Sequence, residues 1–449
     1  MGIVIRRLSG RRDLLAPAAA FPERYPCLLE SVVRGTPQAR FDLLFAFPQS
    51  GLWLQADGRL IDDQGAEHGP SFIEALDRLW QAERTTHVHD DALPFHGGWV
   101  LLLSYELAGE IESRLRLRAP DAIPVAMALR CPAAIIIDHE RNETVLVAEP
   151  GQEHLLDQMV RDLDVPAEVD ELPAPRAIVE DEPGQFIDGV ARIHEHLHAG
   201  DIFQVNLSRA WHADFAEAPA AASLYAALRK ANPAPFAGML QQPDWAVVSS
   251  SPERLVEVRG GIAQTRPIAG TRPRVASDDE LARIRELQTH PKERAEHVML
   301  IDLERNDLGR VCVPGTVQVD ELMVIESYAH VHHIVSNVRG KLRAGVTPGQ
   351  VIAATFPGGT ITGCPKVRCM EIIAALEDAP RGAYTGALGY LDRSGDLDLN
   401  ILIRTLTQSG TKVSFRAGAG IVADSVAEKE LDETRAKARG LLRAFGMRD

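Results

Sequence analysis

The sequence predicts a globular chain in which β-strands and α-helices both contribute to the core. Its 449 residues are 45% hydrophobic and 25% charged, which is typical of a globular protein with one large or two medium domains. Short runs of apolar and β-branched residues indicate strands in both halves. Apolar residues at helical spacing indicate amphipathic helices in the second half.

Charge and cysteine content exclude several classes of partner. The net charge is −15 and the pI is near 5.5, so neither nucleic acid nor an anionic membrane is an expected partner. The five cysteines are scattered and form no Cys-x-x-Cys pair, which predicts neither a disulfide framework nor a zinc knuckle. The first residues lack an apolar leader, and no window approaches 18 apolar residues. We therefore expect a cytoplasmic protein.

A change in composition divides the chain. Residues 166–184 are rich in Pro, Asp and Glu, and we interpret them as a linker between an N-terminal part, 1–165, and a second part, 185–449. The strands predicted in the first part are Phe41–Phe47, Trp99–Ser104, Ala133–Ile137 and Thr144–Ala148, the last two joined by a polar turn.

The second part begins with an expected helix, because Phe186, Val190, Ile193 and Leu197 recur at spacings of four, three and four. Its predicted strands are Ile202–Leu207, Ala246–Ser249 and Arg254–Val258. Two long helices are expected later, over Pro291–Asp307 and Val426–Phe445.

Two pairs of glutamates lie within these long helices. Glu293 with Glu296, and Glu430 with Glu433, are each spaced at i, i+3, which places both carboxylates of a pair on one helix face, with Cβ atoms roughly 5 to 6 Å apart. Oxygen ligands of this kind suit Mg²⁺. The alternative is two solvated helix faces of mixed charge.

Three motifs resemble known binding sites, but the residues around them do not support those sites. Residues 418–423 match a dinucleotide fingerprint, but no second βα unit follows, so we expect a glycine-rich turn whose amides receive a carboxylate. Residues 358–366 lack the ending of a phosphate loop. His330, His332 and His333 fall on two faces of a strand, and no further zinc ligand is evident nearby.

Eight motifs in the second part occur in an order that resembles the chorismate-utilising enzymes. This family includes the large subunits of anthranilate synthase and aminodeoxychorismate synthase, isochorismate synthase and salicylate synthase. The similarity spans about Pro183 to the end, and its motifs are Asp201–Ser208, Ser251–Arg254, Thr265–Arg274, Ile301–Arg310, the histidine strand, Phe356–Arg368, Ile401–Thr405 and Gly418–Ile421. The resemblance implies an α+β fold with two large antiparallel sheets packed face to face and helices outside.

The resemblance also assigns roles around chorismate, which carries two carboxylates and a C4 hydroxyl that must depart. Mg²⁺ would bind the ring carboxylate through Glu296 and Glu433, with Glu293 and Glu430 acting directly or through water. Glu253 would be the general acid at the C4 hydroxyl, unless it is a surface carboxylate at a strand end. His333 would lie beside the ring.

A second group of positions matches the family's substrate-binding residues. Arg404 and Tyr384 would bind the enolpyruvyl carboxylate, for which an arginine fork is suited, although Arg404 could instead form a structural ion pair. The remaining predicted substrate-binding residues are Gly418, Ala419, Gly420, Lys366 and Thr360.

Two positions bear on the reaction. Members of the family that add water carry a lysine where this chain has Gln204, and because Gln204 cannot act as a base, ammonia is the expected nucleophile. Aminodeoxychorismate synthases often carry a lysine at the position of Ala269, before Thr271, whereas anthranilate synthases carry alanine. Ala269 therefore favours amination at C2 with loss of pyruvate.

The rest of the chain favours amination at C4. The segments that resemble aminodeoxychorismate synthase more closely are Tyr25–Ser31, Ala39–Pro48, Leu93–Gly98, Ser104–Leu107 and Phe356–Gly363. The compact N-terminal part also suits that branch. We therefore expect 4-amino-4-deoxychorismate, a precursor of 4-aminobenzoate and folate, made without a covalent lysine intermediate. Anthranilate synthesis is the alternative, and a non-catalytic sensor of chorismate or tryptophan is a minor one.

Two further expectations concern ligands and partners. Leu29, Glu30 and Ser31 resemble the tryptophan-binding motif of the family, with a buried strand edge as the alternative. No cysteine has the setting of a glutaminase nucleophile, and Cys364 lies between Gly363 and Pro365. The chain would therefore need a separate glutamine amidotransferase subunit that supplies ammonia.

Overall fold

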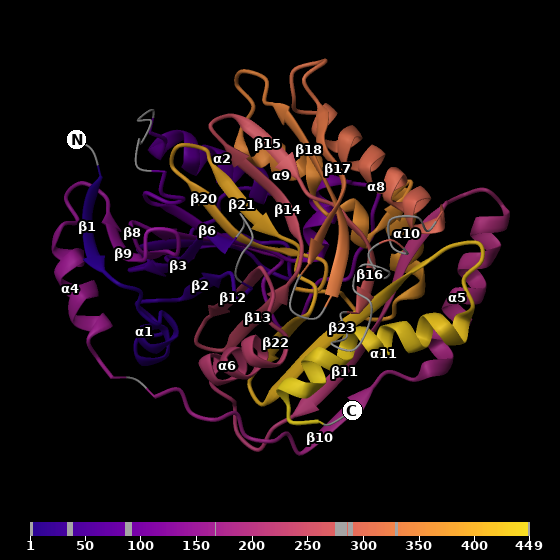
Figure 1. Ribbon diagram of the computed structural model, residues 1–449, viewed down its shortest axis with the longest axis horizontal. Coiled ribbons are helices and arrows are strands. Elements are labelled where there is room, and N and C mark those ends of the chain that lie inside the picture. Colours follow the sequence, from indigo (N-terminus) through magenta and orange to yellow (C-terminus); the bar gives the residue numbers. More distant parts are fainter. Residues whose placement is uncertain are drawn as a thin grey trace.

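Two large antiparallel β-sheets form the centre of the computed structural model, which describes residues 3–33, 39–85, 92–166, 168–273, 285, 291–327 and 331–447 (Figure 1). All strand pairs in the described part are antiparallel. Along each strand, successive side chains alternate between the two faces of the sheet because the backbone is extended and pleated. The α+β fold predicted from the sequence is confirmed.

The first sheet contains twelve described strands. In spatial order they are β1 (Val4–Ser9), β9 (Glu143–Ala148), β8 (Ala133–Asp138), β3 (Phe41–Ala46), β2 (Cys27–Glu30), β12 (Phe236–Gln241), β13 (Trp245–Ser251), β22 (Thr405–Ser409), β23 (Lys412–Ile421), β11 (Gln204–Asp214) and β10 (Ala177–Glu180), with β19 (Gly363–Cys364) also paired to β11.

The second sheet contains eleven described strands. In spatial order they are β16 (Ile268–Pro273), β18 (Val331–Lys341), β15 (Ile262–Thr265), β14 (Arg254–Arg259), β21 (Leu397–Asn400), β20 (Ala387–Asp392), β6 (Gly98–Leu103), β7 (Ala126–Cys131), β4 (Ser50–Leu54) and β5 (Leu60–Asp62), with β17 (Gln318–Ser327) paired to β18.

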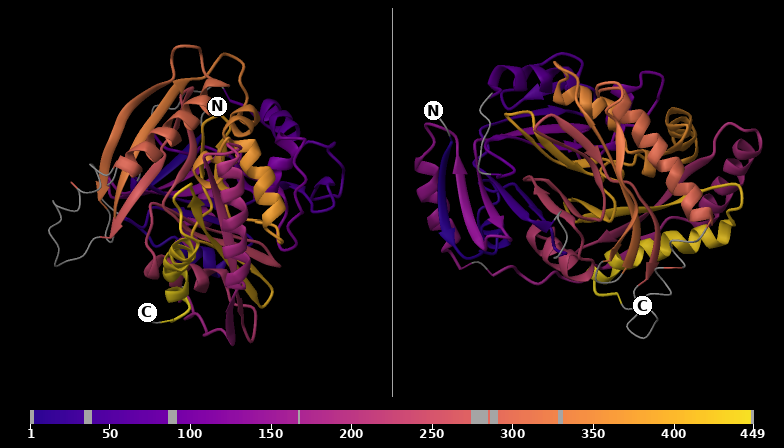
Figure 2. Two further views of the ribbon diagram at one scale, coloured as in Figure 1. Left: turned by 90° about the vertical axis from the view of Figure 1, so that its right-hand side faces the viewer. Right: turned by 45° about the horizontal axis from the view of Figure 1, so that its top comes forward.

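The helices cover the outer faces, as the two further views show (Figure 2). The first sheet packs against α1 (Leu15–Ala20), α4 (His154–Leu163), α6 (Ala221–Ala231) and the C-terminal half of α11 (Ala427–Ala444). Helices on the side of the second sheet include α2 (Phe72–Glu83), α8 (Pro291–Gly309), α9 (Pro348–Thr355) and α10 (Lys366–Leu376), and α5 (Pro183–His198) packs on β11. The short helices are α3 (Ala108–Ile111), η2 (Tyr105–Leu107) and η3 (Gly359–Ile361).

Alternation along the strands explains why the sheets stack. On β3, Leu43 and Phe45 face a core that they share with Val100 and Leu102 of β6, in the other sheet. Leu44 lies on the opposite face, in the core beneath α1, α4 and α6. Both faces of these central strands are thus apolar, and each face is covered by another layer.

Strands from both predicted parts of the chain share each sheet. β2 pairs with β12, and β6 pairs with β20. The division of the sequence at 166–184 stays a prediction, since strand pairing does not test it. Within that range β10 pairs with β11, so part of the expected linker is a strand. No described helix is long and apolar enough to cross a bilayer.

Candidate active site

Three polar side chains share one face of β11 because they alternate along the strand: Gln204, Asn206 and Ser208. All three are at most 9% exposed. The Nε2 of Gln204 donates to Oε1 of Glu296 on α8 at 3.2 Å, while the buried Oε1 of Gln204 has no partner among the described residues. The structure thus joins Gln204 to one of the predicted metal ligands.

The neighbouring strand β23 supplies glycines opposite this polar face. A Cβ atom at Gly418 would lie 2.6 Å from both Asn206 Oδ1 and the Tyr384 hydroxyl, and one at Gly420 would lie 2.4 Å from Gln204 Nε2. The expected glycine-rich turn is wrong, because residues 418–420 lie within a strand in register with β11. Glycine is needed here for space and not for a turn.

Amide groups remain available on this strand. Pairing between β22 and β23 ends at Phe415, so residues 416–421 have a strand partner, β11, on one side only. The carbonyl of Gly418 accepts from Lys437 Nζ of α11 at 2.9 Å. Because no described strand pairs with the other edge of residues 416–421, alternate backbone N–H groups there can bind a carboxylate, as the sequence predicts for residues 418–420.

Glu253 lies just beyond the end of β13 and is 6% exposed. Its amide donates to Ser251 Oγ at 3.2 Å, and its carbonyl accepts from the amide of Ile401 at 3.0 Å. Burial raises the pKa of Glu253 to about 7, and the neighbouring Thr360 hydroxyl and Arg404 only partly oppose that shift. The alternative of an exposed strand-end carboxylate is therefore wrong, and a buried acid that titrates near neutrality is present.

Arg404 interacts with both this acid and Tyr384. Arg404 adopts a positive φ of 55°, and Thr385, beside Tyr384, adopts 63°. Non-glycine residues reach this region at an energetic cost, and such residues cluster at functional sites. Burial lowers the pKa of the Arg404 guanidinium, an effect that Tyr384 and Glu253 oppose. The structure brings together these predicted substrate-binding residues and the predicted acid.

Lys366 forms an ion pair with a buried carboxylate of α8. Its Nζ lies 2.5 Å from Asp307 Oδ2 of α8 and donates to the carbonyl of Thr355 at 3.3 Å. A further acid, Glu304, is 6% exposed on the same helix, and burial, followed by the charge of Asp307, raises its pKa to about 8. Lys366 thus stabilises a buried carboxylate and anchors α10 to α8.

The four predicted metal ligands are all described. Glu293 and Glu296 are half-buried on α8, and Glu433 of α11 forms an ion pair of 2.7 Å with Lys437. The negative charge of Glu433 also acts on Arg404, where it opposes the lowering of the guanidinium pKa. Four carboxylates are a donor set that suits Mg²⁺, but no group of three or more His, Cys, Asp or Glu among the described residues lies close enough to hold a metal ion.

The histidine strand is only partly described. His333 on β18 is 8% exposed, and in the register of the sheet it is opposite Thr271 of β16. Ala269 is opposite Ile334. The side chains of Ala269, Thr271 and His332, and all of His330, lie outside the described part, so their predicted roles stay predictions.

A separate cavity of about 810 Å³ opens where β2, β12, β14 and β20 meet, and Leu29, Glu30 and Ser31 line it. Glu30 accepts from the Tyr225 hydroxyl at 2.7 Å and from Arg229 at 3.2 Å. The sequence thus located a real cavity, and whether tryptophan binds there stays a prediction. Arg254 also lines it, directly after Glu253 in the chain.

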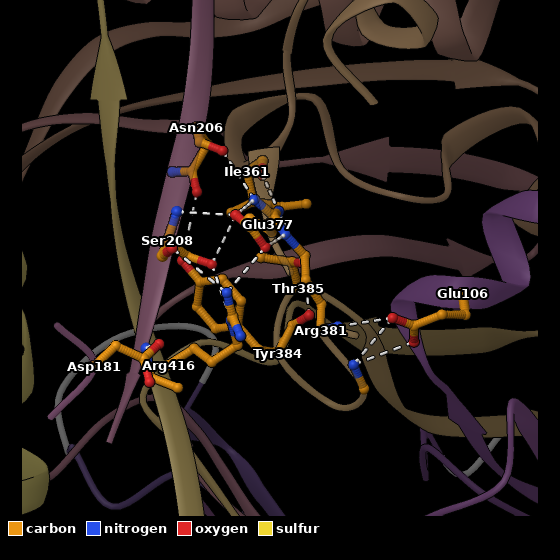
Figure 3. A network of polar contacts seen from close by, with 12 residues as sticks. Glu106, Asp181, Asn206, Ser208, Ile361, Glu377, Arg381, Tyr384, Thr385 and Arg416 are labelled. Carbon is orange, nitrogen blue, oxygen red and sulfur yellow. Dashed lines mark hydrogen bonds and ion pairs between the residues drawn. The ribbon is translucent and has the colours of Figure 1, made fainter. Parts of the chain in front are cut away.

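A buried ion network that the sequence analysis missed lies behind the site (Figure 3). Glu377 accepts from Arg381 at 2.7 and 2.9 Å, from Arg416 at 3.1 Å, and from both the amide and the hydroxyl of Ser208 at 2.9 Å. Burial would raise the pKa of Glu377, but the charges of Arg381 and Arg416 outweigh it and lower the pKa.

Arg381 connects the segments that carry the site. It donates to the carbonyls of Asn206 at 2.8 Å and Ile361 at 3.2 Å, and to the hydroxyl of Thr385 at 3.3 Å. Its guanidinium also lies 5.5 Å from the ring centroid of Tyr384. In the sequence, Glu377 and Arg381 are only an opposite-charge pair four residues apart, a spacing that is common on solvated helices, although both residues lie beyond the end of α10.

Comparisons with known proteins show the family to which the chain belongs. Residues 40–443 match the family of chorismate binding enzymes, and the chain belongs to this family. The match reaches further into the N-terminal part than the motifs after Pro183.

Relatives of both amination branches are similar to the chain. The anthranilate synthase component I-like protein of Synechocystis is 41% identical over 433 residues, covering 93% of this chain and 86% of the relative. Aminodeoxychorismate synthase component 1 of Bacillus subtilis is 40% identical over 384 residues, covering 82% and 80%. Several further relatives bear the name anthranilate synthase component 1.

Solved structures give the same fold. Anthranilate synthase component I from Streptococcus pneumoniae superposes with a TM-score of 0.80 at 31% identity, covering 91% of this chain and 93% of that chain.

Proposed function

We propose that the chain catalyses the amination of chorismate at C4 by ammonia, giving 4-amino-4-deoxychorismate and water. The observation that supports amination is Glu253, a buried acid whose pKa is raised to about 7 and which lies near Arg404, whereas the choice of C4 rests on the segments that resemble aminodeoxychorismate synthase. Loss of the C4 hydroxyl requires a proton, and a carboxylic acid with a pKa near 7 can deliver one at neutral pH. Ammonia supplies the new C–N bond, and the departing hydroxyl leaves as water.

The other residues have supporting roles in the proposal. Arg404, Tyr384 and the amides of residues 418–420 bind the enolpyruvyl carboxylate, and His333 lies beside the ring. Gln204 offers a carbonyl oxygen that has no hydrogen-bond partner among the described residues, and not a base, which suits ammonia as the nucleophile.

Mg²⁺ is the proposed cofactor, and Glu296 and Glu433 would hold it, with Glu293 and Glu430 in support. When bound, the ion would neutralise the ring carboxylate and so stabilise negative charge in the ring. The four glutamates need not form a closed cage before substrate arrives, since Mg²⁺ is commonly bound by one or two carboxylates plus water and substrate oxygens.

Ammonia is proposed to come from a separate glutamine amidotransferase subunit. Burial raises the pKa of the thiol of every cysteine in this chain, including the half-buried Cys364. A glutaminase nucleophile requires the opposite, a thiolate with a lowered pKa. Free ammonium should replace the partner in vitro.

Amination at C2 with pyruvate elimination is the second candidate. Ala269 favours C2 amination, because anthranilate synthases carry alanine at this position and aminodeoxychorismate synthases often carry lysine. Most of the named relatives also belong to the anthranilate synthase branch. The segments between Tyr25 and Leu107, together with Phe356–Gly363, resemble aminodeoxychorismate synthase more closely and favour C4, and one product analysis separates the two.

The test is incubation of the purified chain with chorismate, Mg²⁺ and excess ammonium at mildly alkaline pH, with products separated by mass and fluorescence. Aminodeoxychorismate, convertible to 4-aminobenzoate by an added lyase, is the expected product, and omission of Mg²⁺ should abolish it. Fluorescent anthranilate with pyruvate would show C2 amination instead. No product, with a competent glutaminase also present, would indicate a non-catalytic sensor.

A further inference from the structure

Asn206 has no role in the reaction so far, although it lies on the polar face of β11 between Gln204 and Ser208. We propose that Asn206 is a further substrate-binding residue, which donates a hydrogen bond from its carboxamide to the enolpyruvyl carboxylate in the subsite of Tyr384 and Arg404. This inference rests on chorismate being the substrate, as proposed above.

The orientation of the carboxamide is the first observation. The Tyr384 hydroxyl donates to Asn206 Oδ1 at 3.4 Å, and none of the described residues accepts from Nδ2. Figure 3 shows the carboxamide nitrogen on the side away from Arg381. A primary amide whose oxygen is engaged still has two N–H donors for a ligand.

Contact with Gly418 is the second observation. A Cβ at Gly418 would lie 2.6 Å from Asn206 Oδ1 and 2.6 Å from the Tyr384 hydroxyl oxygen, so glycine lets both polar groups pack against its backbone. Asn206 itself is 9% exposed, so its side chain is not sealed in the core. Asn206 and Tyr384 therefore lie beside residues 418–420, whose amides are proposed to bind the same carboxylate.

The backbone of Asn206 is held at both polar groups. Its carbonyl accepts from Arg381 Nη2 at 2.8 Å, and its amide donates to the carbonyl of Thr362 at 2.9 Å. Because the strand is fixed in this way, little conformational entropy is lost when the carboxamide binds a ligand.

The charge pattern identifies a carboxylate as the ligand group. Burial raises the pKa of the Tyr384 phenol, as does the anion Glu377, while the charges of Arg381, Arg404 and Arg416 oppose that shift, and no described acidic side chain bonds to Asn206. A cation and a neutral N–H donor suit a planar anion, and the Tyr384 hydroxyl joins them only when its single proton turns from Asn206 Oδ1 to the ligand.

The experiment measures kcat and KM for chorismate in the ammonium-dependent reaction with Asn206→Leu and Asn206→Asp. Loss of one hydrogen bond to a charged group should raise KM about 10- to 100-fold in Asn206→Leu, with kcat changing less than about 3-fold. Asn206→Asp should raise KM further, because its charge repels the carboxylate. Asn337→Leu is the matched control, since Asn337 is 7% exposed and bonds to Asp320 on the other sheet.

A second comparison separates direct binding from an effect exerted through Tyr384. In a Tyr384→Phe background, Asn206→Leu should still raise KM severalfold; no further change would overturn the inference, because Asn206 would then only orient the tyrosine. An unchanged KM in the single variant would also overturn it. Thermal unfolding of each variant verifies the fold, and wild-type chain that consumes no chorismate would instead refute the proposed function.

Discussion

Two buried glutamates in this molecule have side-chain pKa values that are shifted in opposite directions. Glu253 and Glu377 are 6% and 9% exposed, yet the pKa of Glu253 is raised to about 7 while that of Glu377 is lowered. Glu377 is bound by Arg381, Arg416 and Ser208, whereas Glu253 has only more distant cations and a neighbouring hydroxyl. Partners, and not burial, decide which carboxyl stays ionised.

The difference separates a reacting group from a supporting one. A carboxyl with a pKa near 7 can exchange its proton during turnover, as Glu253 would in the proposed reaction. A carboxylate between two guanidinium groups keeps its charge and its position, so Glu377 can fix the strands on which the site is built.

The largest expected effect is the loss of the acid. Glu253→Gln keeps the shape and removes the proton, so kcat should fall about 10²- to 10⁴-fold while the protein remains folded. Steady-state kinetics with ammonium would measure this. Glu74→Gln is the control, because the Glu74 side chain is 73% exposed, and it should be neutral. Full activity in Glu253→Gln would contradict the role of Glu253.

Removing the anion of the buried ion network should destabilise the protein. Glu377→Gln leaves Arg381 and Arg416 without their anion, so the free energy of unfolding should fall by about 3 to 5 kcal/mol, measured by urea denaturation. Replacing all three with apolar residues of similar volume should cost less, because no unpaired charge is then buried. If the triple variant is as unstable as Glu377→Gln, unpaired charge is not the cause.

The dependence of stability on pH should differ between the two sites. Because the folded pKa of Glu253 is raised from 4.5 to about 7, its contribution is complete below about pH 4.5 and is lost as pH rises to about 7. The stability of wild type minus that of Glu253→Gln should therefore fall by up to about 3 kcal/mol over that range. For Glu377, whose pKa is lowered, the contribution is lost in the opposite direction, as pH falls. A flat difference curve for Glu253 would disprove the raised pKa.

The smallest expected effect concerns space beside the proposed subsite. Gly418→Ala should raise KM for chorismate roughly tenfold, because the added methyl group overlaps Asn206 and Tyr384. Gly184→Ala is the matched control, since no atom lies within 4 Å of a Cβ at that position. Equal KM values in both variants would show that the close contact at Gly418 does not affect substrate binding.

Much of the local structure was predictable from the sequence. The runs at 133–137 and 144–148 became β8 and β9 within one residue at each end, and the last helix runs over Ala427–Ala444. The predicted strand at Ile202–Leu207 was too short, since β11 continues to Asp214. Its polar residues at alternate positions were the overlooked signal of a strand with one functional face.

Some errors had tertiary causes. Residues 418–420 read as a turn because glycine is common in turns, but pairing with β11 makes them a strand. The sequence also did not predict the ion pair of 2.5 Å between Lys366 and Asp307 of α8, and the substrate-binding role of Lys366 stays a prediction. Contacts between residues this far apart in the chain leave no periodic pattern in the sequence.

The sequence by itself determined the family, the residue types of the site and the spacing of the two glutamate pairs, because motif order and helical periodicity are local properties. Only the tertiary structure decided which groups are charged and how they are held. Glu253 and Glu377 are the same residue type, and their pKa values diverge because packing delivers two arginines to one and mainly desolvation to the other.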